Sequence, residues 1–265
     1  MSEQSAVHEG TAAPGGGLGL ESIRADGSRE AAPERGGTGP TLLRAVHQQP
    51  LGHEHGIVPA HELSWREVVR YGLPHADLPP EIREWRARNA RHLLRGARRV
   101  VAARLLGRSH FYGALSLRVI EGVSGREIDL GLVSMRVVTN TGVGFIVDAF
   151  QNLVELENLK FHALGTGVTA EAAGDTALVT ELTTEYTGNV RATGTTTESA
   201  ANIYRTVGTN TLDGTPGAAL REHGIFDQAA TGGGVLLDRT LFAAITLSSG
   251  DGLQSTYDMT LTAGS

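Results

Sequence analysis

Cysteine is absent from this 265-residue chain. Its absence excludes disulfide bonds, cysteine-ligated zinc, iron–sulfur clusters and a thiol nucleophile. Aromatic residues make up only 5% of the chain, and no apolar run approaches the ~20 residues that a membrane-spanning helix needs. The first residues have neither the basic start nor the apolar stretch of a signal peptide. These absences predict a soluble, non-secreted protein of a reducing compartment, with no membrane contact.

Lysine is almost absent as well, because Lys160 is the only one and all other basic side chains are arginine. The formal net charge of −6 is spread unevenly along the chain. Residues 81–108 contain nine arginines and two acids, whereas residues 1–80 and 109–265 carry an excess of acids. A basic block between acidic segments indicates an electrostatic contact, made with the chain's own acidic part or with a neighbouring molecule.

Composition divides the chain into three segments. Residues 1–60 are rich in Gly, Pro, Ser and charged residues and contain almost no periodic apolar positions. Such a segment buries too little surface to offset its ordering entropy when alone, so we expect an extended arm held by another surface. Residues 61–110 are predicted to be a helical, arginine-rich docking segment, and residues 111–265 an independently folding β domain.

Two helices are predicted in the docking segment. Ser64 and Glu67 form a capping-box pattern at the start of a short helix. Pro79 and Pro80 then open an amphipathic helix of about 26 residues, in which apolar residues recur at helical spacing. Gly96 lies in the middle of this helix and marks a candidate break.

Residues 111–265 show the period-two pattern of β-strands. The odd-numbered residues of 253–261 are expected to face the core, and residues 235–247 are expected to pair with them as a hairpin across the turn sequence SSGDG. Other segments expected to be extended are 115–121, 127–139, 159–165, 189–196, 200–208 and 218–227, with one helix over 141–154. The predicted fold is mainly β, an antiparallel β-sandwich or jelly-roll-like domain with one inserted helix, preceded by the arm and the helical segment.

Candidate chemistry is sparse. Five histidines lie close together in the sequence: His47, His53, His55, His61 and His75. They could bind a metal ion, or they could be polar residues of a docking arm with no ligand. Because no second ligand pair follows at fixed spacing, we predict no metal site and no cofactor. The β region contains His162 and His223, but no nucleophile elbow, phosphate loop, zinc helix or dinucleotide fingerprint occurs. We therefore predict that the protein is not an enzyme.

The arginine-rich helix is the main candidate for a binding site. Its arginines could follow the phosphates of a nucleic acid or lie on an anionic membrane, or they could form salt bridges with an acidic protein surface. The side chains predicted to bind a partner are Arg83, Trp85, Arg86, Arg91, Arg95, Arg98 and Arg99. No recognition motif for nucleic acid accompanies them, so we expect a protein partner.

Four short motifs occur in the β region: GTGVTA at 165–170, DTALVTEL at 175–182, EHGIF at 222–226 and DRTLF at 238–242. In these motifs, residues 135–265 resemble a family of structural proteins from the virions of tailed bacteriophages. The resemblance implies a β domain, a place in the virion after assembly in the host cytoplasm, and other virion proteins as partners.

Two functions of different kinds follow from this resemblance. The first is a capsid-associated decoration or cement protein, which binds neighbouring capsid subunits, the major capsid protein among them, through its arm and helix and forms homo-oligomers. The second is a tail, baseplate or fibre component that contacts the host or a tail partner. A third reading, outside the resemblance, is a nucleic-acid-binding factor that uses the arginine-rich helix.

Overall fold

The computed structural model describes residues 63–106 and 110–263. The chain divides into two units, Met1–Gly39 and Pro40–Ser265, and all described residues belong to the second. The predicted arm over 1–60 and the histidines at positions 47, 53, 55 and 61 lie outside the described residues.

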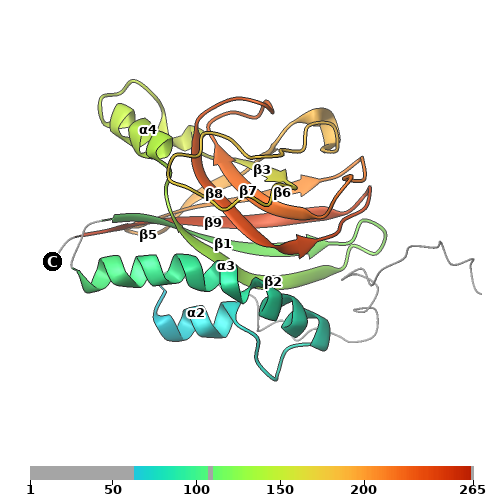
Figure 1. Cartoon of the computed structure of the whole chain (residues 1–265). Helices are drawn as coiled ribbons and strands as arrows, with labels where there is room; N and C mark the ends of the chain where they lie inside the picture. The colour runs from blue at the N-terminus through green and yellow to red at the C-terminus, as the bar shows by residue number, and fades with distance from the viewer. Residues whose placement is uncertain (1–62, 107–109, 264–265) are drawn as a thin grey trace, which may run out of the picture. The chain divides into compact units, whose positions relative to one another are not determined.

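Two antiparallel sheets form the body of the described part, as Figure 1 shows. The first has the strand order β2-β1-β9-β6-β5 and the second the order β4-β3-β7-β8. In chain order the strands are β1 His110–Ile120, β2 Glu127–Val137, β3 Phe161–Gly165, β4 Ala192–Thr193, β5 Thr195–Ala200, β6 Ile203–Thr211, β7 Leu220–Phe226, β8 Leu236–Ile245 and β9 Gly252–Thr262. The prediction of a mainly β, sandwich-like domain with an inserted helix is confirmed.

The predicted hairpin between 235–247 and 253–261 is wrong. β8 pairs with β7 in the four-stranded sheet, whereas β9 pairs with β1 and β6 in the five-stranded sheet. The SSGDG segment therefore carries the chain from one sheet to the other. Asp251 holds this connection, since its carboxylate accepts hydrogen bonds from the Ser248 and Gly122 amides at 2.9 and 3.0 Å. An alternating pattern identifies a strand with a buried face, but it does not identify the strand's partner.

The face predicted for β9 is largely confirmed. Leu253, Ser255 and Tyr257 are buried, with at most 1% of each exposed, and Met259 is 7% exposed. Leu261, at the end of the strand, is 39% exposed. The opposite face of β9 is covered as well near its end, where Asp258 and Thr260 are buried.

The helices begin where their caps predict. α2 spans Trp65–Gly72, and its capping box is present, because the Ser64 amide donates to Glu67 Oε2 at 2.8 Å and the Glu67 amide donates to Ser64 Oγ. α3 spans Pro80–Leu105 without interruption, so Gly96 is not a break. α4 spans Asn140–Phe150 and ends four residues before the predicted position. The short 3-10 turns are η1 Leu156–Asn158 and η2 Thr187–Asn189.

Helix α3 is part of the β domain's own core. Ile82 and Trp85 belong to the same buried cluster as side chains of both sheets, among them Leu115 and Phe242. Farther along, Leu93, Ala97 and Val100 pack on β1 and β2. The predicted division between residues 110 and 111 therefore runs through a single core, and it is not a boundary between an independent domain and a docking segment.

Candidate interaction surface

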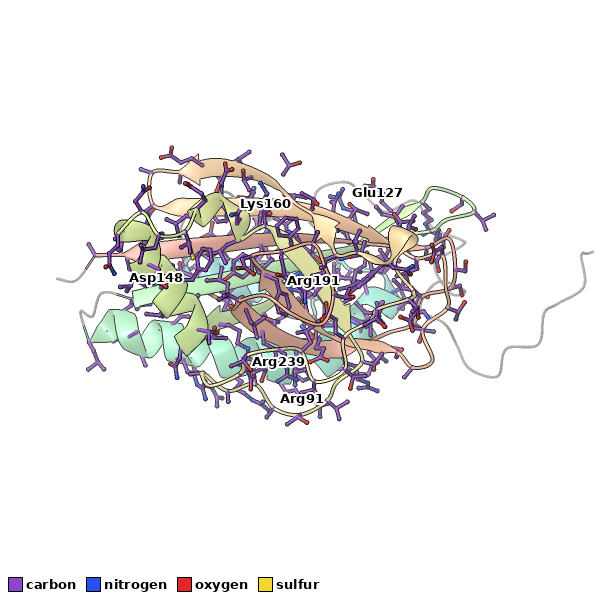
Figure 2. All side chains as sticks on the ribbon, turned by 90° about the horizontal axis from the view of Figure 1, so that it is seen from above. Arg91, Glu127, Asp148, Lys160, Arg191 and Arg239 are labelled. Carbon is purple, nitrogen blue, oxygen red and sulfur yellow. The ribbon has the colours of Figure 1, made fainter. Side chains whose placement is uncertain are left out.

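Helix α3 has one buried face and one basic face. The buried side chains are those of Ile82, Trp85, Arg86, Asn89, His92, Leu93, Ala97 and Val100. Six arginines are exposed and lie on the other side of the helix, at a rotation of ~100° per residue: Arg83, Arg88, Arg91, Arg95, Arg98 and Arg99. We call these six the α3 basic face. Figure 2 shows Arg91 near the edge of the molecule as seen from above.

The predicted partner-binding role of Trp85 and Arg86 is wrong, because both side chains are buried inside the fold, at 0% and 1% exposure. Trp85 Nε1 donates to the Ala244 carbonyl on β8 at 3.2 Å, and Arg86 Nε donates to the Leu130 carbonyl on β2 at 3.0 Å. Burial lowers the pKa of Arg86 to about 10, although nearby Asp129 acts in the opposite direction. Counting arginines along the chain could not separate this one from its exposed neighbours.

Asn89 was missed by the sequence analysis, although it joins the two sheets. Its Nδ2 donates to the Val133 carbonyl on β2 at 2.8 Å, and its Oδ1 accepts from the Ala243 amide on β8 at 2.9 Å. β2 and β8 are edge strands of their sheets, so one amide satisfies unpaired backbone groups of both edges. The available signal was an asparagine in an otherwise apolar stripe with Ile82, Trp85 and Leu93.

This anchoring leaves most of the α3 basic face without ionic partners. Arg95 lies 3.4 Å from a Glu171 carboxylate oxygen, and buried Arg136 also pairs with Glu171. The other five arginines of the face form no ion pair with any residue in the described part of the chain. The alternative that the arginines form salt bridges with the chain's own acids therefore explains only Arg95 among the six.

The four motifs meet at one buried ionic cluster around Glu222 and Arg239. Glu222 is 0% exposed and accepts from the amides of Gly167, Val179 and Thr180 at 2.8–3.2 Å. Arg239 Nε donates to Glu222 at 2.8 Å, and its Nη1 donates to Asp175 at 3.0 Å. Residues that are up to 72 positions apart in the sequence, Gly167 and Arg239, thus hold the 165–182 segment against β7 and β8.

A second ion pair, between Arg191 and Glu181, lies next to this cluster in the sequence. Arg191 is fully buried, donates to both carboxylate oxygens of Glu181 at 2.6 and 3.0 Å, and lies 3.6 Å from the centre of the Phe226 ring. In Figure 2, seen from above, it lies near the centre of the outline. These clusters give the motifs a structural role, because their charged groups are directed inward and satisfied there.

The two histidines of the β region form a buried pair. His162 Nδ1 lies 3.1 Å from His223 Nε2, and His162 Nε2 lies 3.2 Å from the Thr206 hydroxyl. Burial lowers the pKa of His162 to about 3 and that of His223 well below its ordinary value. The pair is closed to solvent, at 0% and 1% exposure, and its hydrogen bonds are made inside the fold.

Nearby, Asp238 is buried beside Thr240 and Tyr257, and burial raises the pKa of its carboxyl to about 6. Within residues 63–106 and 110–263, no cluster of His, Asp and Glu is arranged to hold a metal ion. In the same ranges, no helix is both long enough and apolar enough to cross a membrane.

Comparisons of the chain with models of protein families, with curated proteins and with solved structures found no match. The α3 basic face presents six exposed arginines, of which all but Arg95 form no ion pair within the described residues, on a helix whose other face is fixed by buried side chains and by hydrogen bonds to two sheet edges.

Proposed function

We propose that this protein is a structural component of a tailed-bacteriophage virion, associated with the capsid, and that the α3 basic face binds an acidic surface of a neighbouring subunit. The observation that carries the proposal is a rigidly held helix with six exposed arginines, five of which form no ion pair with any described residue. The resemblance of the motifs in 165–182, 222–226 and 238–242 to virion proteins supplies the biological setting.

The exposed face of α3 is preorganised for binding. A guanidinium group binds a carboxylate through two parallel hydrogen bonds and cannot be replaced by an ammonium group without losing that geometry. Because Trp85, Arg86 and Asn89 anchor α3 to the sheets, little backbone freedom is lost when the exposed face binds. A rigid row of arginines therefore favours a protein partner with carboxylates at matching positions.

The first experiment is a count of the protein in purified particles by quantitative mass spectrometry. A copy number in simple proportion to the capsid lattice supports a capsid-associated protein. A small number fixed by the tail would instead assign the protein to the tail, baseplate or fibre. Absence from purified particles would overturn the virion proposal altogether.

The second experiment separates a protein partner from a nucleic acid. Arg88→Lys combined with Arg91→Lys keeps the charge and removes the bidentate geometry, so we expect particle incorporation to fall severalfold while folding is unchanged. Arg66→Lys, an exposed arginine on α2, is the matched control and should incorporate normally. Normal incorporation of the double variant, together with DNA binding that falls steeply with salt, would overturn the protein-partner reading.

A further inference from the structure

Helix α4 exposes an apolar surface that nothing in the described chain covers. Its inner side packs Phe145 and Ile146 into the core. Its outer side and the turn after it expose five apolar side chains, between 40% and 78%: Val143, Val147, Phe150, Leu153 and Leu156. The three on the helix are spaced i, i+4 and i+7, so they share one face. A contiguous apolar group of this kind is typical of a protein–protein contact.

Three exposed carboxylates belong to the same segment as this apolar group. Asp148 on α4 is exposed and is labelled in Figure 2, and Glu155 and Glu157 are exposed in the turn that follows. None of the three forms an ion pair with another residue of the described ranges. We call the five apolar residues and these three acids the α4 surface, which combines exposed apolar side chains with negative charges.

The C-terminal end of α3 has the complementary character. Leu105 and Leu106 are 83% and 66% exposed, and Arg98 and Arg99 are exposed and form no ion pair within the described residues. We call these four residues the α3 end. It combines apolar side chains and positive charges, as a partner of the α4 surface would require.

The two complementary surfaces cannot meet within one chain. Figure 1 shows α4 and the C-terminal end of α3 at the same end of the sandwich, with the sheets between them. A contact between them therefore requires two copies. Because both surfaces lie at one end, a two-fold axis there can bring each α4 surface against the α3 end of the other copy, so that every contact is made twice.

We propose that the chain self-associates as a two-fold dimer in which the α4 surface of each copy binds the α3 end of the other. This inference rests on the proposed function in taking the α3 basic face as a contact surface, and it names a second copy as the partner of one end of that face. The apolar side chains supply most of the buried surface, and the charged side chains fix the orientation.

The test is charge-reversal complementation with the full chain, followed by analytical ultracentrifugation. One variant carries Arg98→Glu and Arg99→Glu, and the other carries Asp148→Lys and Glu155→Lys. Each variant alone places like charges opposite each other in both contacts, so dimerisation should weaken by at least ~100-fold. In an equimolar mixture both contacts of the mixed dimer join opposite charges, so the mixture should dimerise.

A matched control carries Glu127→Lys and Asp213→Lys, which change the net charge equally at exposed positions, and it should dimerise like the unaltered chain. Figure 2 shows Glu127 toward the opposite end of the molecule from Asp148, and the register of β6, β9, β1 and β2 places Thr211, two residues before Asp213, at the same end as Glu127.

A monomeric unaltered chain, or a mixture that fails to restore the dimer, would overturn the inference. Either result would leave the proposed function standing if the protein is present in particles and its incorporation depends on Arg88 and Arg91. Conversely, the dimer can be established even if no particle contains the protein.

Discussion

At the scale of single residues, Glu222 is the most connected side chain of the motif cluster. Its two carboxylate oxygens accept from three backbone amides and from Arg239. A carboxylate has about four favourable acceptor positions, so these four donors use its full capacity. All of the donors come from outside Glu222's own strand, so a change at this position affects the 165–182 segment as well as β8.

We expect Glu222→Gln to lower the free energy of unfolding by about 3 kcal/mol. The substitution removes the negative charge that pairs with buried Arg239, and it places an amide N–H opposite groups that are themselves hydrogen-bond donors. Chemical denaturation would measure the change. The control is Glu127→Gln, which removes an exposed partner of Arg118 at 2.7 Å and should cost less than about 1 kcal/mol. Equal effects of the two substitutions would show that the buried cluster is not a special source of stability.

At the scale of elements, the contact between α3 and β2 depends on a glycine. A side chain at Gly96 would overlap the Met135 backbone carbonyl, so the helix can approach the strand only at a residue without Cβ. Gly144 on α4 is also helical, but a Cβ there would meet no atom within 4 Å. Alanine at Gly96 therefore tests the close packing of α3 on β2, whereas alanine at Gly144 tests helix propensity alone.

We expect Gly96→Ala to destabilise the protein by about 2 kcal/mol, because α3 must move away from β2. Gly144→Ala should instead stabilise it by roughly 0.5–1 kcal/mol, since alanine is the better helix former. Thermal unfolding of both variants would give the sign of each effect. Stabilisation by both alanines would contradict the close approach of α3 to β2.

At the scale of the whole molecule, buried titratable groups give stability a dependence on pH. His162 and His223 are neutral in the fold, whereas in the unfolded chain they gain protons below pH ~6.5. The unfolded state therefore binds more protons than the folded state between pH ~6.5 and about 3, so stability falls as the pH falls through this window. Asp238 acts oppositely, because its raised pKa of about 6 makes the folded state the better proton binder on acidification.

We expect the destabilising effect of the two histidines on acidification to exceed the stabilising effect of Asp238. The free energy of unfolding should therefore decrease as the pH falls from 6.5 to 4. Replacing both histidines by glutamine should flatten this decrease, and Asp238→Asn should steepen it by removing the opposing group. Urea denaturation at a series of pH values would measure all three proteins. If the histidine variant keeps the full pH dependence, the acid sensitivity comes from other groups, such as His92, whose pKa is also lowered, to about 4.

Local patterns in the sequence were sufficient for the helix starts and for the β class. The Ser64–Glu67 capping box, the prolines before α3 and the alternation in β9 all act between residues a few positions apart, so they can be read without knowledge of the fold. The four motifs were visible too, but as separate turns and strands. Their meeting at Glu222 and Arg239 could not be derived from spacing.

The sequence by itself determined that an arginine-rich amphipathic helix precedes a set of short strands. Only the tertiary structure decided that β8 and β9 belong to different sheets, that α3 closes the edges of both sheets, and that Arg86 is buried while Arg88 is exposed. The physical reason is that strand partners, edge contacts and burial are set by residues far apart in the chain. Their energies depend on which surfaces come together, and no local pattern records that choice.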